Sequence, residues 1–108
     1  MAVLTVQKLA SAGVTPTYGA ADAAGDKFAN NGRTFLVVKN GSASAVTVTV
    51  NSQKQCDQGF DHDITVSVGA SGEKWIGPLD PNRFNNASGQ VEVAYSAVAS
   101  VTVAAVQV

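Results

Sequence analysis

Apolar and polar residues alternate along several short stretches of the chain. Residues 46–50 read VTVTV, residues 64–68 read ITVSV and residues 91–95 read VEVAY. Because successive side chains of a strand point to opposite faces of a sheet, this alternation predicts strands with one buried face. The β-branched side chains favour the same structure, since they pack well on a pleated surface. Residues 34–39 (TFLVVK) are apolar on both faces, which predicts a central strand or an outer face that meets a partner.

Turn-forming residues separate these stretches. Residues 40–42 and 69–72 predict the turns of two antiparallel hairpins, because Gly and Asn accept the positive φ that tight turns need. Residues 96–100 lack both residue types and carry a weaker signal for a third hairpin. Residues 51–63 and 77–90 are longer links, which we expect to pass between two sheets. The second link contains two prolines, so it is a poor candidate for a central strand.

The strand pattern continues to the N-terminus, where one more strand is expected near residues 3–7. No stretch of ten or more residues has the 3.6-residue period of an amphipathic helix, and the alanine-rich residues 20–24 are flanked by glycines. We therefore expect an all-β fold of about seven or eight short strands, an antiparallel β-sandwich or a jelly-roll-like barrel. It would form a single domain over residues 1–108, with residues 1–33 as an N-terminal arm or extended loop region.

The composition narrows the classes of partner. Charged residues make up only 14% of the chain, against roughly 25% in an average soluble protein, and the net charge is −1. Nucleic acid and anionic membrane are therefore not expected as partners. No stretch approaches the ~20 apolar residues of a membrane span, and the N-terminal residues lack the basic start of a signal peptide. A single cysteine cannot form an internal disulfide, so we expect synthesis in a reducing cytosol.

Residues 56–63 (CDQGFDHD) hold the chain's only cysteine and only histidine beside three aspartates. Cys56, His62 and one carboxylate fall short of a standard zinc set, and the aspartates lack the spacing of a calcium-binding loop. A flexible loop would also not hold Cys56 and His62 as nucleophile and base. We therefore expect no metal site, no cofactor and no enzymatic activity. The interpretation is a loop in which Asp61 or Asp63 accepts hydrogen bonds from backbone amides.

The aromatic residues divide by their position in the pattern. Three belong to strand stretches and are expected in the core: Phe35, Trp75 and Tyr95. The other four lie outside those stretches: Tyr18, Phe28, Phe60 and Phe84. Because a loop aromatic without a place in the core is a typical anchor for a protein partner, we expect these four to make partner contacts. The alternative is a carbohydrate-binding β-sandwich module, with Trp75 and Tyr18 facing a glycan and calcium held by the aspartate loop.

Longer stretches of the chain resemble small structural virion proteins of tailed bacteriophages, in particular the head decoration, or cement, proteins. The resemblance is carried by residues 28–41 (FANNGRTFLVVKNG), 46–48 (VTV), 75–78 (WIGP), 91–96 (VEVAYS) and 101–105 (VTVAA). It implies a protein made in the cytoplasm of the bacterial host and located on the capsid surface of the virion. There it would bind the lattice of the major capsid protein and stabilise the head. It also implies self-association, for example as a trimer, and no cofactor. Another small head or tail structural role is the alternative that the resemblance leaves open.

Overall fold

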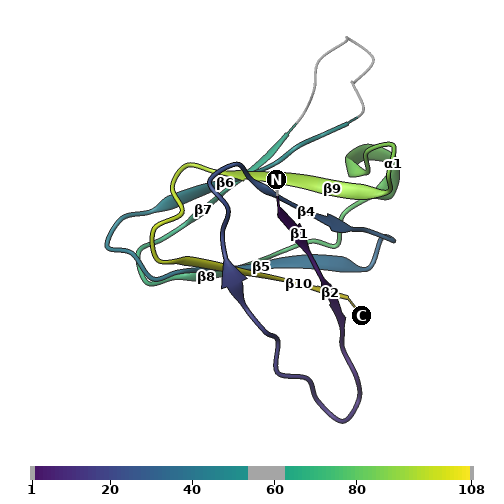
Figure 1. Ribbon diagram of the computed structural model, residues 1–108, viewed down its shortest axis with the longest axis horizontal. Coiled ribbons are helices and arrows are strands. Elements are labelled where there is room, and N and C mark those ends of the chain that lie inside the picture. The colour runs from purple at the N-terminus through teal and green to yellow at the C-terminus, as the bar shows by residue number, and fades with distance from the viewer. Residues whose placement is uncertain (1, 54–62, 108) are drawn as a thin grey trace.

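The computed structural model describes residues 2–53 and 63–107, and there the regular secondary structure is almost entirely β-strand. Two five-stranded sheets lie face to face (Figure 1). Sheet A contains, in spatial order, β1 (Ala2–Leu4), β4 (Asp26–Ala29), β9 (Gln90–Tyr95), β6 (Val46–Val50) and β7 (Ile64–Val68). Sheet B contains β2 (Val6–Lys8), β10 (Val101–Gln107), β5 (Thr34–Asn40) and β8 (Glu73–Ile76), with β3 (Gly19–Ala20) also paired to β10. The predicted all-β sandwich is confirmed.

The alternating stretches bury their apolar face between the two sheets. In β6, for example, Val46, Val48 and Val50 are at most 1% exposed, whereas the threonines between them point outward. Valines of β9 and β10 do the same from both sheets, and Phe28 and Leu36 fill the space between them. The core is therefore built from β-branched side chains of modest size, as the period of two predicts.

The three turns predicted to close hairpins instead carry the chain from one sheet to the other. β5, β8 and β10 lie in sheet B, while their expected partners β6, β7 and β9 lie in sheet A. The turn residues mark where the chain reverses, but a reversed strand can pair beside its predecessor or pack across from it. Residues 51–63, predicted to cross, instead connect the antiparallel neighbours β6 and β7. Residues 77–90 do cross between the sheets, and they include the short helix α1 (Pro81–Phe84).

A buried asparagine holds two of these connections together. Asn40, 1% exposed at the end of β5, donates from Nδ2 to the backbone oxygens of Ser44, Val68 and Gly69 at 2.8, 3.1 and 3.3 Å. Its Oδ1 accepts from the Ser42 amide at 3.0 Å and the Ser42 hydroxyl at 2.6 Å. One side chain thus links the connection after β5 to the connection after β7.

The N-terminal region takes part in both sheets. β1 pairs parallel to β4 in sheet A, and after Thr5 the chain enters sheet B as β2, parallel to β10. The expectation of an arm over residues 1–33 is therefore wrong for these strands and for β4, and the two parallel pairs make both sheets mixed. What remains extended is the 9–18 loop, which projects beyond sheet B before the chain returns as β3 (Figure 1).

Candidate partner-binding face

The outward-facing side chains of sheet B are unusually apolar. Phe35 and Val37 of β5 lie opposite Val106 and Ala104 of β10, and Val37 also lies opposite Trp75 of β8. Val37 and Val106 are fully buried, yet neither belongs to the cluster between the sheets. These five residues form a second apolar layer, which we call the outer apolar face. The two-sided apolar pattern of residues 34–39 predicted either a covered central strand or a partner-facing one.

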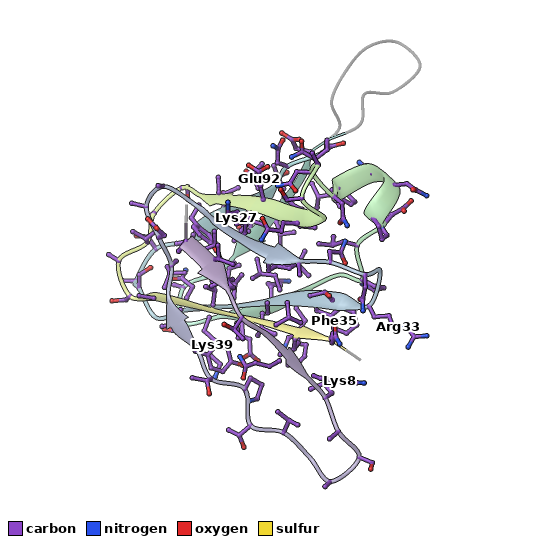
Figure 2. The ribbon with its side chains drawn as sticks, turned by 45° about the vertical axis from the view of Figure 1, so that its right-hand side comes forward. Lys8, Lys27, Arg33, Phe35, Lys39 and Glu92 are labelled. Atoms are coloured by element: carbon purple, nitrogen blue, oxygen red, sulfur yellow. The ribbon has the colours of Figure 1, made fainter. Side chains whose placement is uncertain are left out.

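The opposite side of the sandwich differs in chemistry. Sheet A points charged and hydroxyl side chains outward, among them the cross-strand pair Lys27 and Glu92 (Figure 2). Thr47 and Ser67 lie opposite each other on the same face and are exposed. Hydroxyl and charged groups keep their hydration at little cost, so this side suits contact with water. On sheet B the apolar Val37, Val106 and Ala104 are already covered, and Trp75 is the exposed apolar group.

Trp75 is the most exposed aromatic residue of this face. It is 52% exposed, and it is the chain's single tryptophan. The prediction that Trp75 lies in the core is wrong, because the neighbouring Ile76 takes the inward position of β8. β8 is also an edge of sheet B in the described part of the chain, so no strand beyond it flanks the indole there. A large aromatic side chain held half in water by a rigid sheet is a typical anchor for a protein contact.

A charged rim borders the outer apolar face at Lys39. The Lys39 ammonium lies 4.1 Å from the centroid of the Tyr18 ring and 3.7 Å from Oε1 of its cross-strand neighbour Glu73. Figure 2 shows Lys39 and Phe35 on the sheet B side of the sandwich. Both partners of the ion pair are half-exposed, so the pair contributes little to stability. The contact between Lys39 and the Tyr18 ring keeps the half-buried Tyr18 at the border of the outer apolar face. Tyr18 was predicted to contact a partner.

The 9–18 loop is fixed at its base and open at its tip. The Gln7 side chain donates from Nε2 to the Thr17 oxygen at 2.9 Å and accepts the Thr17 amide at 2.8 Å. This side-chain amide therefore replaces a backbone partner and ties the returning segment to β2. At the tip the Gly13 amide donates to Ala10 O at 2.9 Å, and Val14 is 38% exposed. The loop presents an exposed apolar residue beyond sheet B from an anchored base.

A shallow pocket of about 360 Å³ lies where the chain passes from sheet A to sheet B. Nine residues line it: Val3, Leu4, Thr5, Gln7, Thr17, Gly19, Val103, Ala104 and Ala105. This lining combines apolar and hydroxyl side chains with the Gln7 amide. It can accept an apolar side chain of a partner.

Two of the predicted contact residues belong to the core instead. Phe28 is fully buried in β4 and Phe84 is 3% exposed in α1, where Arg83 lies 4.8 Å from its ring centroid. Their assignment as partner contacts is therefore corrected. The strand that contains Phe28 (DKFA) was not predicted from the sequence, because its other inward position is an aspartate and the apolar alternation is lost. Phe60 lies outside the described residues.

That inward aspartate, Asp26, pairs with the third aromatic residue expected in the core. Tyr95 is partly buried and its hydroxyl donates to Asp26 Oδ2 at 2.7 Å, and the Asp22 amide approaches the same oxygen at 3.4 Å. Asp26 is fully buried, and among the described residues its Oδ1 has no hydrogen-bond partner. Burial, the Asp26 hydrogen bond and the negative charges of Asp26 and Asp22 raise the pKa of Tyr95 well above its usual value. Tyr95 therefore stays a neutral donor inside the sandwich.

Most of the CDQGFDHD stretch lies outside the described residues, including Cys56, Asp61 and His62. Asp63 is described, and its Oδ1 accepts the Ser52 amide at 2.7 Å, a backbone role expected for an aspartate here. In residues 2–53 and 63–107 no three His, Cys, Asp or Glu side chains gather as a metal site. No helix within those ranges is long and apolar enough to cross a bilayer.

Comparison with known proteins returns no relative. No family model matches the chain, and neither a curated protein nor a solved structure matches it at a significant level.

Proposed function

We propose that this protein is a structural virion protein, a capsid decoration protein that binds the major capsid protein lattice of a tailed phage and stabilises the head. The observation that carries the proposal is the half-exposed Trp75 on the outer apolar face of sheet B. The resemblance of the sequence to phage decoration proteins supports the same reading. In this proposal Trp75, the exposed residue of the outer apolar face, and the exposed tip of the 9–18 loop contact the capsid.

The physical chemistry of the face suits a protein partner. Tryptophan and tyrosine recur as anchors in protein interfaces because each buries a large area while few rotatable bonds are fixed. The anchor here sits on a strand, so little backbone entropy is lost on binding. The chain also carries few charges, which lowers the cost of removing water from its surface.

Many copies on one shell would explain how a small protein stabilises a head. An interface of roughly 1,600 Å² suffices for a stable specific contact. A partner that binds only the assembled lattice raises the stability of that lattice by mass action, and contacts repeated over a shell add together. No chemical step and no cofactor enter this mechanism.

The single tryptophan provides a direct test. On mixing with expanded, empty phage shells, the protein should sediment with them and Trp75 emission should shift to shorter wavelength, because the indole leaves water. Decorated shells should also withstand a higher temperature than bare shells. Trp75→Ala should weaken shell binding at least tenfold, whereas Thr47→Ala on the outer face of sheet A should bind like the unaltered protein.

Two results would contradict the proposal. One is absence of sedimentation with any shell, and the other is equal weakening by Trp75→Ala and Thr47→Ala. The carbohydrate-binding alternative would be favoured by a glycan that shifts the Trp75 emission and raises the melting temperature without shells. In the structure Lys39 covers one face of the Tyr18 ring, so of the two aromatic residues in this alternative Trp75 is the more open to stacking on a sugar.

A further inference from the structure

β7 forms an edge of sheet A that lacks the usual protection against pairing with another chain. Among the described strands it has one hydrogen-bonded neighbour, β6, and the register runs from Ile64 to Val68 without a bulge. Its sequence, ITVSV, contains no charge and no proline. Edge strands of soluble proteins normally contain charged residues or proline, because the unpaired backbone N–H and C=O groups of an edge can otherwise pair with a further strand.

The other edges of the sandwich are shorter or charged. β8 has four residues and begins with Glu73 and Lys74, and Lys74 lies on the inward side, opposite Val38. β1 and β2 have three residues each, with Lys8 at the end of β2, and β3 has two. Among the described strands, β7 is thus the longest edge and carries no charged side chain. β7 is therefore the edge best suited to pair with another strand.

The inward side chains of β7 are also incompletely covered. Ile64 and Val66 pack against the core but stay partly exposed, whereas the corresponding Val48 and Val50 of β6 are fully buried. A strand added beyond β7 would cover this apolar margin. The incomplete burial of these side chains is a separate observation from the unpaired backbone groups of β7.

We propose that β7 pairs antiparallel with β7 of a second copy of this chain, with Val66 on the two-fold axis. The strand is self-complementary about that residue. Ile64 would lie opposite Val68 on the inner face, and Thr65 would lie opposite Ser67 on the outer face. Apolar side chains meet apolar ones, hydroxyls meet hydroxyls, and no like charges are opposed. An isologous contact of this kind closes as a dimer, joining the two A sheets into one.

The size of the contact sets its strength. Five residues span about 17 Å, so the edge buries far less than the roughly 1,600 Å² of a standard interface. We therefore expect a weak dimer that is populated at high protein concentration. The contact uses the edge of sheet A, whereas shell attachment is proposed for the outer apolar face of sheet B. Either proposal can therefore fail while the other stands.

Cysteine cross-linking tests the register in a Cys56→Ser background. Directly opposed residues have Cα atoms about 4.5 to 5.5 Å apart, within disulfide range, whereas Thr65 would be about 8 Å from Thr65 of the second copy. Val66→Cys should form a disulfide dimer by itself. Thr65→Cys and Ser67→Cys should cross-link when mixed, and neither should do so alone. Thr47→Cys, outward on an interior strand, is the control and should stay monomeric.

Charged pairs provide a second, non-covalent test by sedimentation equilibrium. Thr65→Lys combined with Ser67→Lys opposes like charges and should abolish the dimer, while Thr65→Lys combined with Ser67→Glu opposes unlike charges and should restore it. Both changes lie on exposed positions, and equal melting temperatures would confirm that each variant is folded. Cross-linking without this register, equal association of both charge variants, or a trimer as the associated species would overturn the proposal.

Discussion

Asp26 and Tyr95 form a polar pair inside a sandwich whose core consists mainly of valines. The carboxylate is fully buried and receives the Tyr95 hydroxyl at 2.7 Å. Removing a partner from a buried polar group usually costs more than the hydrogen bond itself contributes, because the remaining group keeps its desolvation penalty. This pair therefore fixes β4 against β9 with a directional contact that valines cannot supply.

Tyr95→Phe is expected to lower the free energy of unfolding by about 1–3 kcal/mol at pH 7, since Asp26 loses its closest donor. The raised pKa of Tyr95 adds a pH signature. The unfolded chain releases the phenolic proton near pH 10 and the folded chain retains it, so this contribution is full below pH 10 and is lost as pH rises above it.

Denaturant unfolding of both proteins at pH 7 and at pH 10 to 11 measures the two effects. The gap between Tyr95→Phe and the unaltered protein should narrow at high pH. Tyr18→Phe, at the edge of the outer apolar face, serves as a control for the loss of a phenol. A gap that stays constant or widens as pH rises would contradict the assignment.

Residue positions were predictable from sequence where a period of two could be counted. The inward valines of β6 and β9 followed directly from the alternation. Trp75 and Phe28 did not, because each lies in a four-residue strand in which too few positions establish the phase. Gln7 was missed altogether, since nothing in the local sequence indicates that its amide pairs with Thr17.

At the scale of elements, strands were easier to predict than their partners. The strands at residues 34–40, 46–50 and 64–68 were anticipated, but β5 pairs with β8 and β10 instead of β6. Pairing between sheets depends on long-range burial, and a short turn of Gly, Asn and Ser is compatible with either outcome. The signal that distinguishes them is Asn40, whose buried side chain joins two turns distant in sequence.

Asn40→Ala is expected to lower the free energy of unfolding by about 1–3 kcal/mol, because buried backbone oxygens of two connections lose their donor. Thermal or denaturant unfolding measures this loss. The exposed Asn51→Ala is the matched control and should change stability by less than about 0.5 kcal/mol. Equal effects of the two substitutions would show that the link between the connections contributes nothing.

The whole molecule separates its surfaces by chemistry. Sheet A faces outward with hydroxyl and charged groups, sheet B carries the outer apolar face, and the net charge is only −1. Attachment through sheet B should therefore depend on water exclusion more than on ion pairing.

Shell binding is accordingly expected to resist salt. Raising sodium chloride from about 50 mM to about 500 mM should change the dissociation constant by less than about threefold, and ammonium sulfate should strengthen binding. Sedimentation with shells across the salt series measures both effects. A loss of binding by an order of magnitude or more would assign the contact to charges such as Lys39 instead.

β10 lies at the centre of sheet B, paired with β5 on one side and with β2 and β3 on the other. β10 follows all the other described strands in the sequence. During synthesis, sheet B therefore lacks its central strand until β10 has been made. Phe35 and Val37 lack their neighbours Val106 and Ala104 until residues 101–107 have been synthesised. Sheet B, which carries the surface proposed to join the shell, is therefore completed only after its other strands have been made.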